Sequence, residues 1–239
     1  MSLKNKVVLV SGANRGIGAA TVRELLGAGV KKIYATARNL ASLPDFGDQR
    51  VVPLQLDVTS DASVAQALAA AQDVDILLNN AGSLAFNDFI TSSHEELNGD
   101  METNYYGTLR LIRAFVPGFA ARGSGTVVNV VSIVGLVSAP PLGGYSASKA
   151  ALHSLTQTLR GTLKPSGIDV IGIYPGPIDT DLAKHIPLQK VTPEHAAANI
   201  VRGLENGDTY IFPDPTAQQI EHLWANDGRS LEAAMAAAG

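Results

Sequence analysis

The stretch Ser-Gly-Ala-Asn-Arg-Gly-Ile-Gly (residues 11–18) follows a short apolar run, VVLV at 7–10, and leads into a segment of helical period. Its glycines, Gly12, Gly16 and Gly18, are spaced as GxxxGxG. At such a turn the bare backbone can approach a pyrophosphate, and the N–H groups and dipole of the helix N-terminus stabilise its charge. The stretch therefore predicts a phosphate-binding turn between a strand and a helix. The alternative is a glycine-rich turn that only packs tightly.

Short apolar, β-branched runs alternate with longer helical segments along the rest of the chain, as in βαβ units. The pattern predicts an α/β fold, a Rossmann-type doubly wound sheet of seven mostly parallel strands with helices on both faces. Pro117 lies within one helical pattern and is expected to kink it or end it early. The expected strands are 6–12, 32–38, 51–58, 75–82, 126–132, 169–176 and 209–214.

The composition sets further limits. The 239 residues are 46% hydrophobic and 17% charged, which suits a single domain over residues 1–239. With no cysteine, disulfides, thiolate nucleophiles and cysteine-bound zinc are excluded. A net charge of −4 without any basic run argues against nucleic acid and an anionic membrane surface as partners. We expect a cytoplasmic protein with a small-molecule partner.

Further motifs follow the glycine turn in a fixed order: NNAG at 79–82, Ser132, YSASK at 145–149 and PGPIDT at 175–180. Together with GxxxGxG they resemble the short-chain dehydrogenase/reductase family from Lys6 to Pro213. The resemblance implies a single-domain, NADP-preferring carbonyl reductase or alcohol dehydrogenase.

The choice of dinucleotide depends on the end of the second strand. An acid there would bind the adenosine ribose of NAD, whereas a guanidinium accommodates the 2′-phosphate of NADP. The chain has Ala37 followed by Arg38, and Arg15 within the glycine turn is a second cation suited to a phosphate. This pattern predicts NADP(H) as cofactor. The alternative is that both arginines are ordinary surface residues.

The resemblance extends the cofactor site beyond these arginines. Asp57 and Val58 match positions beside the adenine, although Asp57 could equally cap the helix that begins near Ser60. Asp179 and Asp181 flank a threonine of PGPIDT and are interpreted as solvated loop acids. The full set implied is Gly12, Asn14, Arg15, Gly16, Ile17, Gly18, Arg38, Asp57, Val58, Asn80, Ala81, Gly82, Tyr145, Lys149, Pro175, Gly176, Ile178 and Thr180.

Tyr145 and Lys149 are the candidate proton-transfer pair. On a helix these positions share a face, and a nearby cation favours the phenolate of a tyrosine whose ordinary pKa is near 10. Such pairs are common on exposed helices, so the spacing alone is weak. Ser132 at the end of the fifth strand strengthens the hypothesis, because open α/β sheets bind ligands at that edge.

The resemblance implies a role for each of four residues. Ser132 polarises a substrate carbonyl, Tyr145 passes the proton, Lys149 lowers the tyrosine pKa and holds the nicotinamide ribose, and Asn104 holds a water that links Lys149 to solvent. A hydrolase interpretation of Ser132 is disfavoured because its context, VVSIVG, is no GxSxG elbow. The histidines lack ligand spacing, so no catalytic metal is expected.

The predicted substrate pocket is mostly apolar, which favours a hydrophobic ketone, aldehyde or alcohol. Its residues are Ser132, Val134, Leu142, Tyr145 and Leu182. An acyl thioester has little support because no cation clearly belongs to this set. Two alternatives remain open: a non-catalytic NADP-binding regulator, and an NAD-dependent alcohol dehydrogenase that works in the oxidative direction. Relatives associate through the helices that contain Asn104 and Tyr145, so a homodimer or homotetramer is expected.

Overall fold

Seven strands form one sheet in the order β3-β2-β1-β4-β5-β6-β7. The computed structural model describes residues 1–237, and within them each pairing between neighbouring strands is parallel. All seven predicted strands are confirmed, with shorter bounds because the chain leaves the sheet early at the carboxyl ends. The strands are β1 Val7–Val10, β2 Lys32–Ala37, β3 Val51–Gln55, β4 Ile76–Asn79, β5 Gly125–Val130, β6 Ile168–Ile173 and β7 Tyr210–Ile211.

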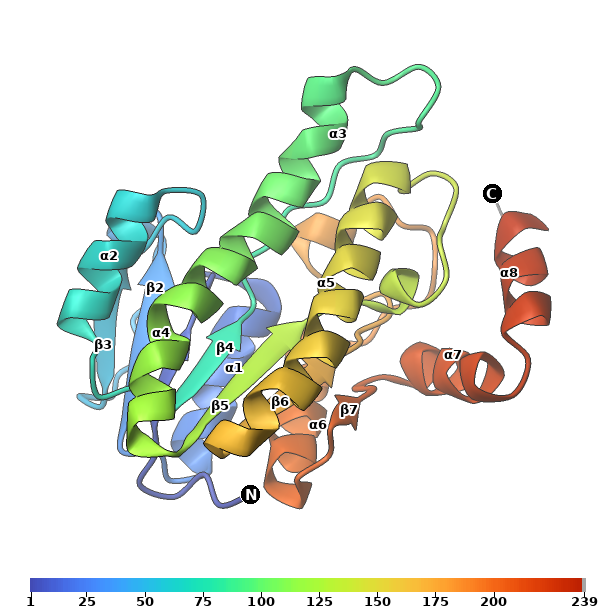
Figure 1. Ribbon diagram of the computed structural model, residues 1–239. Helices are drawn as coiled ribbons and strands as arrows, with labels where there is room; N and C mark the ends of the chain where they lie inside the picture. The colour runs from blue at the N-terminus through green and yellow to red at the C-terminus, as the bar shows by residue number, and fades with distance from the viewer. Residues whose placement is uncertain (238–239) are drawn as a thin grey trace.

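Helices cover both faces of the sheet (Figure 1). Side chains alternate along β1, so Val8 and Val10 meet the layer of α1 and α6, while Leu9 meets the layer of α2, α4 and α5. The predicted doubly wound architecture is thereby confirmed. The helices are α1 Gly16–Gly27, α2 Asp61–Ala70, α3 His94–Asp100, α4 Thr108–Arg122, α5 Gly143–Leu163, α6 Pro193–Asn206, α7 Pro215–Asn226 and α8 Gly228–Ala237.

The strand order places the site. The chain runs outward from β1 through β2 to β3 and then returns to pair β4 with the other side of β1. At such a topological switch point, the loops after the two central strands separate and leave a crevice at the carboxyl edge of the sheet. The turn at 11–18 and the motif at 79–82 follow β1 and β4, so both lie at this crevice.

The rod formed by α3 and α4 has two irregular features (Figure 1). A π-helical turn, Met101–Gly107, joins the two helices, and π-turns inside α-helices often mark functional positions. The helix α4 continues through Pro117 to Arg122. Of the two expectations at Pro117, a kink or an early end, the early end is therefore wrong. Burial of Phe115 and Phe119 on either side of the proline holds the helix on the sheet.

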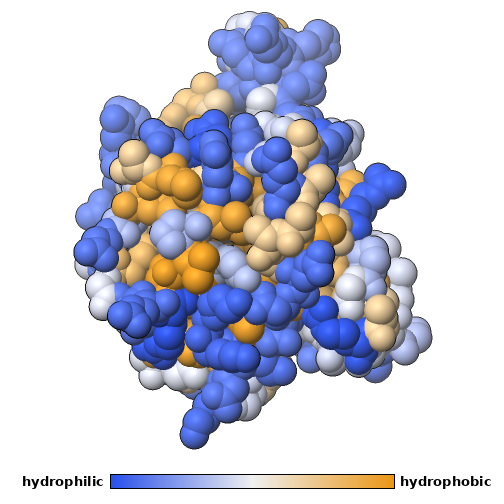
Figure 2. Space-filling model, turned by 90° about the vertical axis from the view of Figure 1, so that its left-hand side faces the viewer, coloured by the Kyte–Doolittle hydropathy of each residue, from blue (hydrophilic) through white to orange (hydrophobic). Residues whose placement is uncertain are grey.

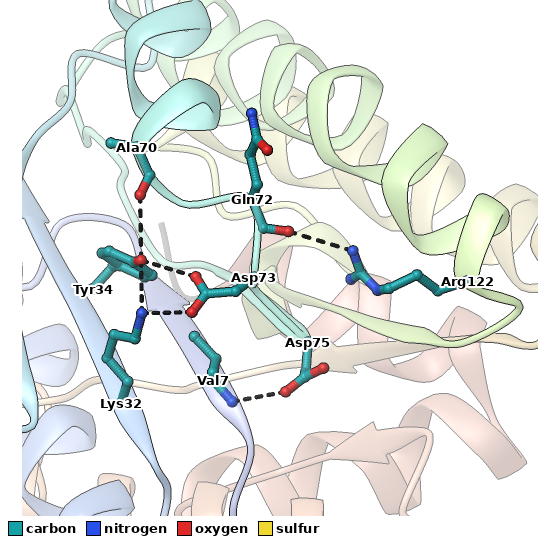
Figure 3. Close-up of polar contacts among 8 residues, drawn as sticks. All are labelled: Val7, Lys32, Tyr34, Ala70, Gln72, Asp73, Asp75 and Arg122. Atoms are coloured by element: carbon teal, nitrogen blue, oxygen red, sulfur yellow. Dashed lines mark hydrogen bonds and ion pairs between the residues drawn. The ribbon is translucent and has the colours of Figure 1, made fainter.

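A polar cluster fixes the amino edge of the sheet, opposite the crevice (Figure 3). The Tyr34 hydroxyl donates to Asp73 Oδ1 at 2.8 Å and accepts from Lys32 Nζ at 3.0 Å. Asp73 also pairs with Lys32. Beside them, Asp75 Oδ2 accepts from the backbone N–H of Val7 at 2.9 Å. These contacts tie β1 and β2 to the segment before β4, away from the cavity.

We expect Asp73→Ala to lower the free energy of unfolding by about 1 kcal/mol, because one partly exposed ion pair and one hydrogen bond are lost. Burial acts to raise the pKa of Asp73, but the bonds from Lys32 and Tyr34 outweigh it and the pKa is lowered. Its contribution is therefore present above the unfolded pKa and is lost as pH falls through the folded pKa. Urea denaturation at neutral and acidic pH measures this. Asp73→Asn should lose less, and equal stability of Asp73→Ala and wild type would contradict the prediction.

The side of the molecule where β3 and α2 lie exposes apolar side chains among hydrophilic ones (Figure 2). β3 is an edge strand, and its Val52 is 37% exposed beside the exposed Pro53. A proline has no N–H to donate, so it limits pairing of this edge with another chain. Across residues 1–237, no helix has the length and apolar character needed to cross a bilayer.

Candidate active site

A cavity of about 730 Å³ lies at the carboxyl edge of the sheet, where the predicted motifs meet. Every residue of the predicted cofactor set and of the predicted substrate set lines it. Of the predicted residues, only Asn104 lies outside its lining. Residues far apart in the sequence are thus brought into one continuous space.

The glycine turn requires its glycines for steric reasons. Gly12 and Gly16 have φ of +66° and +53°, a backbone region that favours glycine. A Cβ on Gly18 would lie 2.3 Å from the carbonyl oxygen of Gly12 and 2.5 Å from Nδ2 of Asn80. That amide in turn donates to the carbonyl oxygens of Ser11 and Gly12, both at 3.0 Å. The turn therefore exposes backbone without side chains at its glycines, is held in place by Asn80, and leads directly into the N-terminus of α1.

The two arginines differ in their surroundings. Arg15 Nη1 lies 2.7 Å from Asp181 Oδ2, and both side chains are well exposed. Asp181 is thus solvated, as expected, and also bridges the glycine turn to the loop after β6. Arg38 forms no ion pair within residues 1–237 and follows Ala37, a small residue that leaves the strand end open. Of the two cations, Arg38 is the one without a carboxylate at ion-pair distance there, although its charge helps to lower the pKa of Asp57.

Asp57 does not cap the helix that follows. Its Oδ1 accepts hydrogen bonds from the N–H of Thr59 at 2.9 Å and from its hydroxyl at 2.7 Å, and these bonds lower its pKa. The N-cap of α2 is Ser60, whose hydroxyl accepts from Ser63 N. The capping alternative for Asp57 is therefore wrong, and its side chain closes a turn at the cavity wall.

Tyr145 and Lys149 lie in the first two turns of α5. Lys149 is 4% exposed, its Nζ donates to the carbonyl oxygen of Val130 at 2.9 Å, and it lies 5.6 Å from the centroid of the Tyr145 ring. Burial lowers the pKa of Lys149 to about 8, and the carboxylate of Asp100 opposes that shift.

The pKa of Tyr145 is raised from its ordinary value near 10. Burial raises it to about 12, a hydrogen bond with Ser132 lowers it, and the charge of Asp100 raises it. Desolvation is the largest of these effects. At neutral pH the phenol keeps its proton.

Ser132 lies two residues after the end of β5 and is 8% exposed. Its Oγ lies 3.3 Å from the carbonyl oxygen of Pro175 and accepts from Val134 N at 3.3 Å. His153 on α5 contacts a different partner, the Tyr174 hydroxyl, at 2.8 Å. Among the described residues, Ser132 therefore forms no triad of the hydrolase type with a histidine. Within residues 1–237 no group of three or more His, Asp or Glu side chains is arranged to hold a metal ion.

Asn104 lies in the π-helical turn and is fully buried. Its Oδ1 accepts from Ser83 N at 2.9 Å, and its Nδ2 donates to Ser83 O at 3.0 Å and to Ser148 Oγ at 2.9 Å. The side chain thus fastens α5 to the segment after NNAG.

The Gly143-Gly144 pair at the start of α5 has a packing reason. A Cβ on Gly143 would lie 3.0 Å from the Phe89 ring, and one on Gly144 would lie 3.0 Å from the amide of Asn87. The backbone and side-chain oxygens of Asn87 accept from the N–H groups of Gly143 at 3.2 Å and Gly144 at 2.9 Å. Asn87 therefore holds the helix that carries Tyr145. Sequence reasoning gave no sign of this role.

Two further residues were not predicted. Asp214 is 1% exposed and accepts from the N–H groups of Gly176 at 2.7 Å and Ala217 at 2.9 Å, so it ties PGPIDT to the start of α7. An aspartate before a proline is a helix-start signal that could have pointed to it. Met235 of α8 lines the cavity, and Leu231 anchors that helix in a core cluster with Val134. The Ala-rich tail gave no such signal.

The comparisons with known proteins agree with this arrangement. The sequence model described as short chain dehydrogenase matches residues 6–190. The chain belongs to the short-chain dehydrogenase/reductase family. The seven-stranded parallel sheet is shared with solved structures of that family.

Several short-chain dehydrogenases of known structure resemble the whole chain. One from Burkholderia cenocepacia, in complex with NADP, is 36% identical with a TM-score of 0.92, covering 98% of this chain and 99% of that one. Another from Streptomyces avermitilis is 30% identical with a TM-score of 0.83, covering 95% of each chain. The 3-oxoacyl-(acyl-carrier-protein) reductase of Vibrio cholerae is 34% identical over 191 residues, covering 77% of this chain and 78% of that protein.

The matched part of the short-chain dehydrogenase model ends at residue 190. Helices α6, α7 and α8 lie beyond it, and with them Asp214 and Met235. The glycine turn and the Ser132, Tyr145 and Lys149 positions all fall within the match. The part of the cavity wall formed by α8 therefore belongs to the region that the family model does not describe.

Proposed function

We propose that the chain is an NADP(H)-dependent oxidoreductase that interconverts a hydrophobic ketone or aldehyde and the corresponding alcohol. One observation carries the proposal: Ser132, Tyr145 and Lys149 meet in the same cavity as the glycine turn. A hydroxyl, a phenol and a buried ammonium beside a dinucleotide-type turn are suited to carbonyl reduction, which needs a proton as well as a hydride.

The residues fit NADP(H). The bare turn and the N-terminus of α1 suit a pyrophosphate, and the free guanidinium of Arg38 with Arg15 nearby suits the 2′-phosphate. The relative in complex with NADP supports this choice. When bound, the cofactor supplies the hydride. An NAD-dependent enzyme would be expected to carry an acid where this chain has Ala37.

The chain's own residues then have distinct tasks. Ser132 Oγ orients and polarises the substrate carbonyl by a hydrogen bond. Tyr145, which keeps its proton at neutral pH, gives that proton to the carbonyl oxygen. Lys149 holds positive charge behind the phenol and stabilises the phenolate that forms. Oxidation of an alcohol uses the same groups in reverse, with Tyr145 accepting the proton.

The substrate end of the cavity is apolar. Leu84, Leu142, Leu182, Ile186 and Met235 line it, which favours an uncharged, hydrophobic substrate. A second candidate is reduction of a 3-oxoacyl thioester, because the 34% identical relative from Vibrio cholerae has that activity in its name.

Incubation with NADPH and a panel of aryl ketones, aldehydes and a 3-oxoacyl thioester, followed at 340 nm, tests the proposal. We expect consumption of NADPH with hydrophobic ketones and slower reaction with NADH. Faster reaction with the thioester would favour the second candidate. NADPH binding without turnover across the panel would favour a non-catalytic regulator. Chiral analysis of the product assigns the stereochemistry.

We also propose that the protein acts in the cytoplasm as a homodimer or homotetramer. The absence of cysteine is compatible with a reducing compartment. Tyr106, within the π-helical turn that follows α3, is 46% exposed, a position suited to contact between subunits. Light scattering after size exclusion measures the oligomeric state, and Tyr106→Glu is expected to weaken the assembly.

A further inference from the structure

Asp100 is a buried carboxylate that the proposed reaction does not use. It is the last residue of α3 and is 2% exposed. Its Oδ1 accepts from the hydroxyl of Ser83 at 2.6 Å, and its Oδ2 accepts from the N–H of Ala85 at 3.1 Å. Both donors belong to the segment that leaves NNAG and carries Leu84 into the cavity. Burial of a carboxylate is unfavourable unless it is hydrogen-bonded, so its presence here needs a reason.

A chain of hydrogen bonds joins Asp100 to the helix of the proposed proton donor. Ser83 N donates to Asn104 Oδ1 at 2.9 Å, and Asn104 Nδ2 donates to Ser148 Oγ at 2.9 Å. The Ser148 hydroxyl donates to the carbonyl oxygen of Tyr145 at 2.7 Å. The network therefore runs from the end of α3 to the first turn of α5.

The backbone between these groups is closely packed. A Cβ on Gly82 would lie 2.9 Å from Asn104 Oδ1 and 3.8 Å from Lys149 Nζ. The Lys149 ammonium is thus separated from the hydrogen-bond network of Asp100 by little more than the backbone of Gly82. Asp100, Asn104 and Lys149 are all buried, and a buried charge acts more strongly on its neighbours than it would in water.

Asp100 is the charged group that acts on both proton-transfer residues. Burial lowers the pKa of Lys149, and Asp100 on α3 raises it. Burial raises the pKa of Tyr145, Ser132 after β5 lowers it by a hydrogen bond, and Asp100 raises it. On α5 itself, Tyr145 and Lys149 face each other. The carboxylate thus favours the protonated form of both groups.

We propose that Asp100 is a positioning residue that holds a negative charge beside the Lys149 and Tyr145 pair, while it fixes Ser83 and Ala85 beside Asn104. A neutral asparagine could keep both partners only by accepting from Ala85 N and donating its amide to Ser83 Oγ. The charge is the part that acts on the reaction. The kinetic consequences rest on the proposed reductase function.

Asp100→Asn removes the charge and keeps the size. Because Asp100 raises both pKa values, its loss lowers both, and the alkaline limb of kcat/KM for NADPH-dependent ketone reduction should move to lower pH. We expect a shift of about one pH unit, the size produced by one charge acting across a partly shielded site. At pH 6, where both groups stay protonated, the rates of variant and wild type should be similar.

Two matched variants separate charge from structure. Ser83→Ala removes the 2.6 Å hydrogen bond and keeps the carboxylate, so its pH profile should coincide with that of wild type. Asp100→Glu restores the charge and should restore the alkaline limb. A profile of Asp100→Asn that coincides with wild type, or an equal shift in Ser83→Ala, would overturn the proposal. Should Asp100→Asn fail to fold, Asp100→Ser removes the same charge, and Ser83→Ala remains the control for the lost hydrogen bond.

A readout without turnover keeps this inference separate from the proposed function. Lysine side chains labelled with ¹³C at Cε are titrated by NMR, and the Lys149 signal is assigned by its loss in Lys149→Met. We expect Lys149 to titrate at lower pH in Asp100→Asn than in wild type. An unchanged titration overturns the role of Asp100, whatever the protein reduces. Absence of turnover in wild type with a normal shift would instead overturn the reductase proposal alone.

Discussion

Tyr145→Phe is expected to lower kcat for ketone reduction by about 10²- to 10⁴-fold, the range typical of the loss of a general acid. The phenylalanine keeps the ring beside Lys149 and removes only the hydroxyl that interacts with Ser132. The carbonyl oxygen then receives no proton as the hydride arrives. NADPH binding should be unchanged, because the rest of the cavity lining is retained.

Stopped-flow NADPH oxidation measures the chemical step, and quenching of protein fluorescence measures cofactor binding. Tyr105→Phe is the matched control, since Tyr105 lies edge-on to Tyr106 and lines no part of the cavity. Residual activity of Tyr145→Phe close to that of the control would remove Tyr145 as the proton donor. Loss of NADPH binding would show a structural effect instead.

Arg38→Asp is expected to raise the KM for NADPH by about 10- to 100-fold, because a hydrogen bond to a charged group contributes about 1.5–3 kcal/mol. The new carboxylate also repels the 2′-phosphate, while NADH, which lacks that group, should be affected far less. Arg38 is the stronger choice for this test because Arg15 is already paired with Asp181.

Steady-state kinetics with both cofactors decide this prediction. Arg113→Asp makes the same change of charge on the exposed side of α4, away from the cavity lining, and should alter neither KM. Equal increases for NADPH and NADH in Arg38→Asp would show that Arg38 does not read the 2′-phosphate. A shift of preference toward NADH would support the assignment.

The seven strands could be predicted because each is encoded locally. Runs such as VVLV at 7–10 are apolar at consecutive positions, as strands covered on both faces must be. The predicted ends of the strands were less accurate, since the apolar sequence continues after the hydrogen bonds between the strands stop. The early end proposed at Pro117 was wrong for a related reason: tertiary burial of Phe115 and Phe119 outweighs the loss of one helical hydrogen bond.

The lining of the cavity was also predictable from motifs, because the carboxyl ends of parallel strands meet at one edge of a sheet. What the motifs did not give was the electrostatic state of the site. The pKa of Tyr145 is raised, although Lys149 is near, because burial dominates. Burial is a property of the folded chain, and no spacing of residues reports it.

The sequence by itself determined the parallel sheet, the family and the motif residues around the cavity, because these depend on short patterns of hydrophobicity, glycine and motif order. Only the tertiary structure decided which other side chains hold the motif residues in place. Asp181 reaches Arg15 across 166 positions, Asp214 holds Gly176, Asn87 holds the start of α5, and Asp100 holds Ser83. Each of these contacts joins segments distant in the chain, so each exists only once hydrophobic burial has folded the loops against one another.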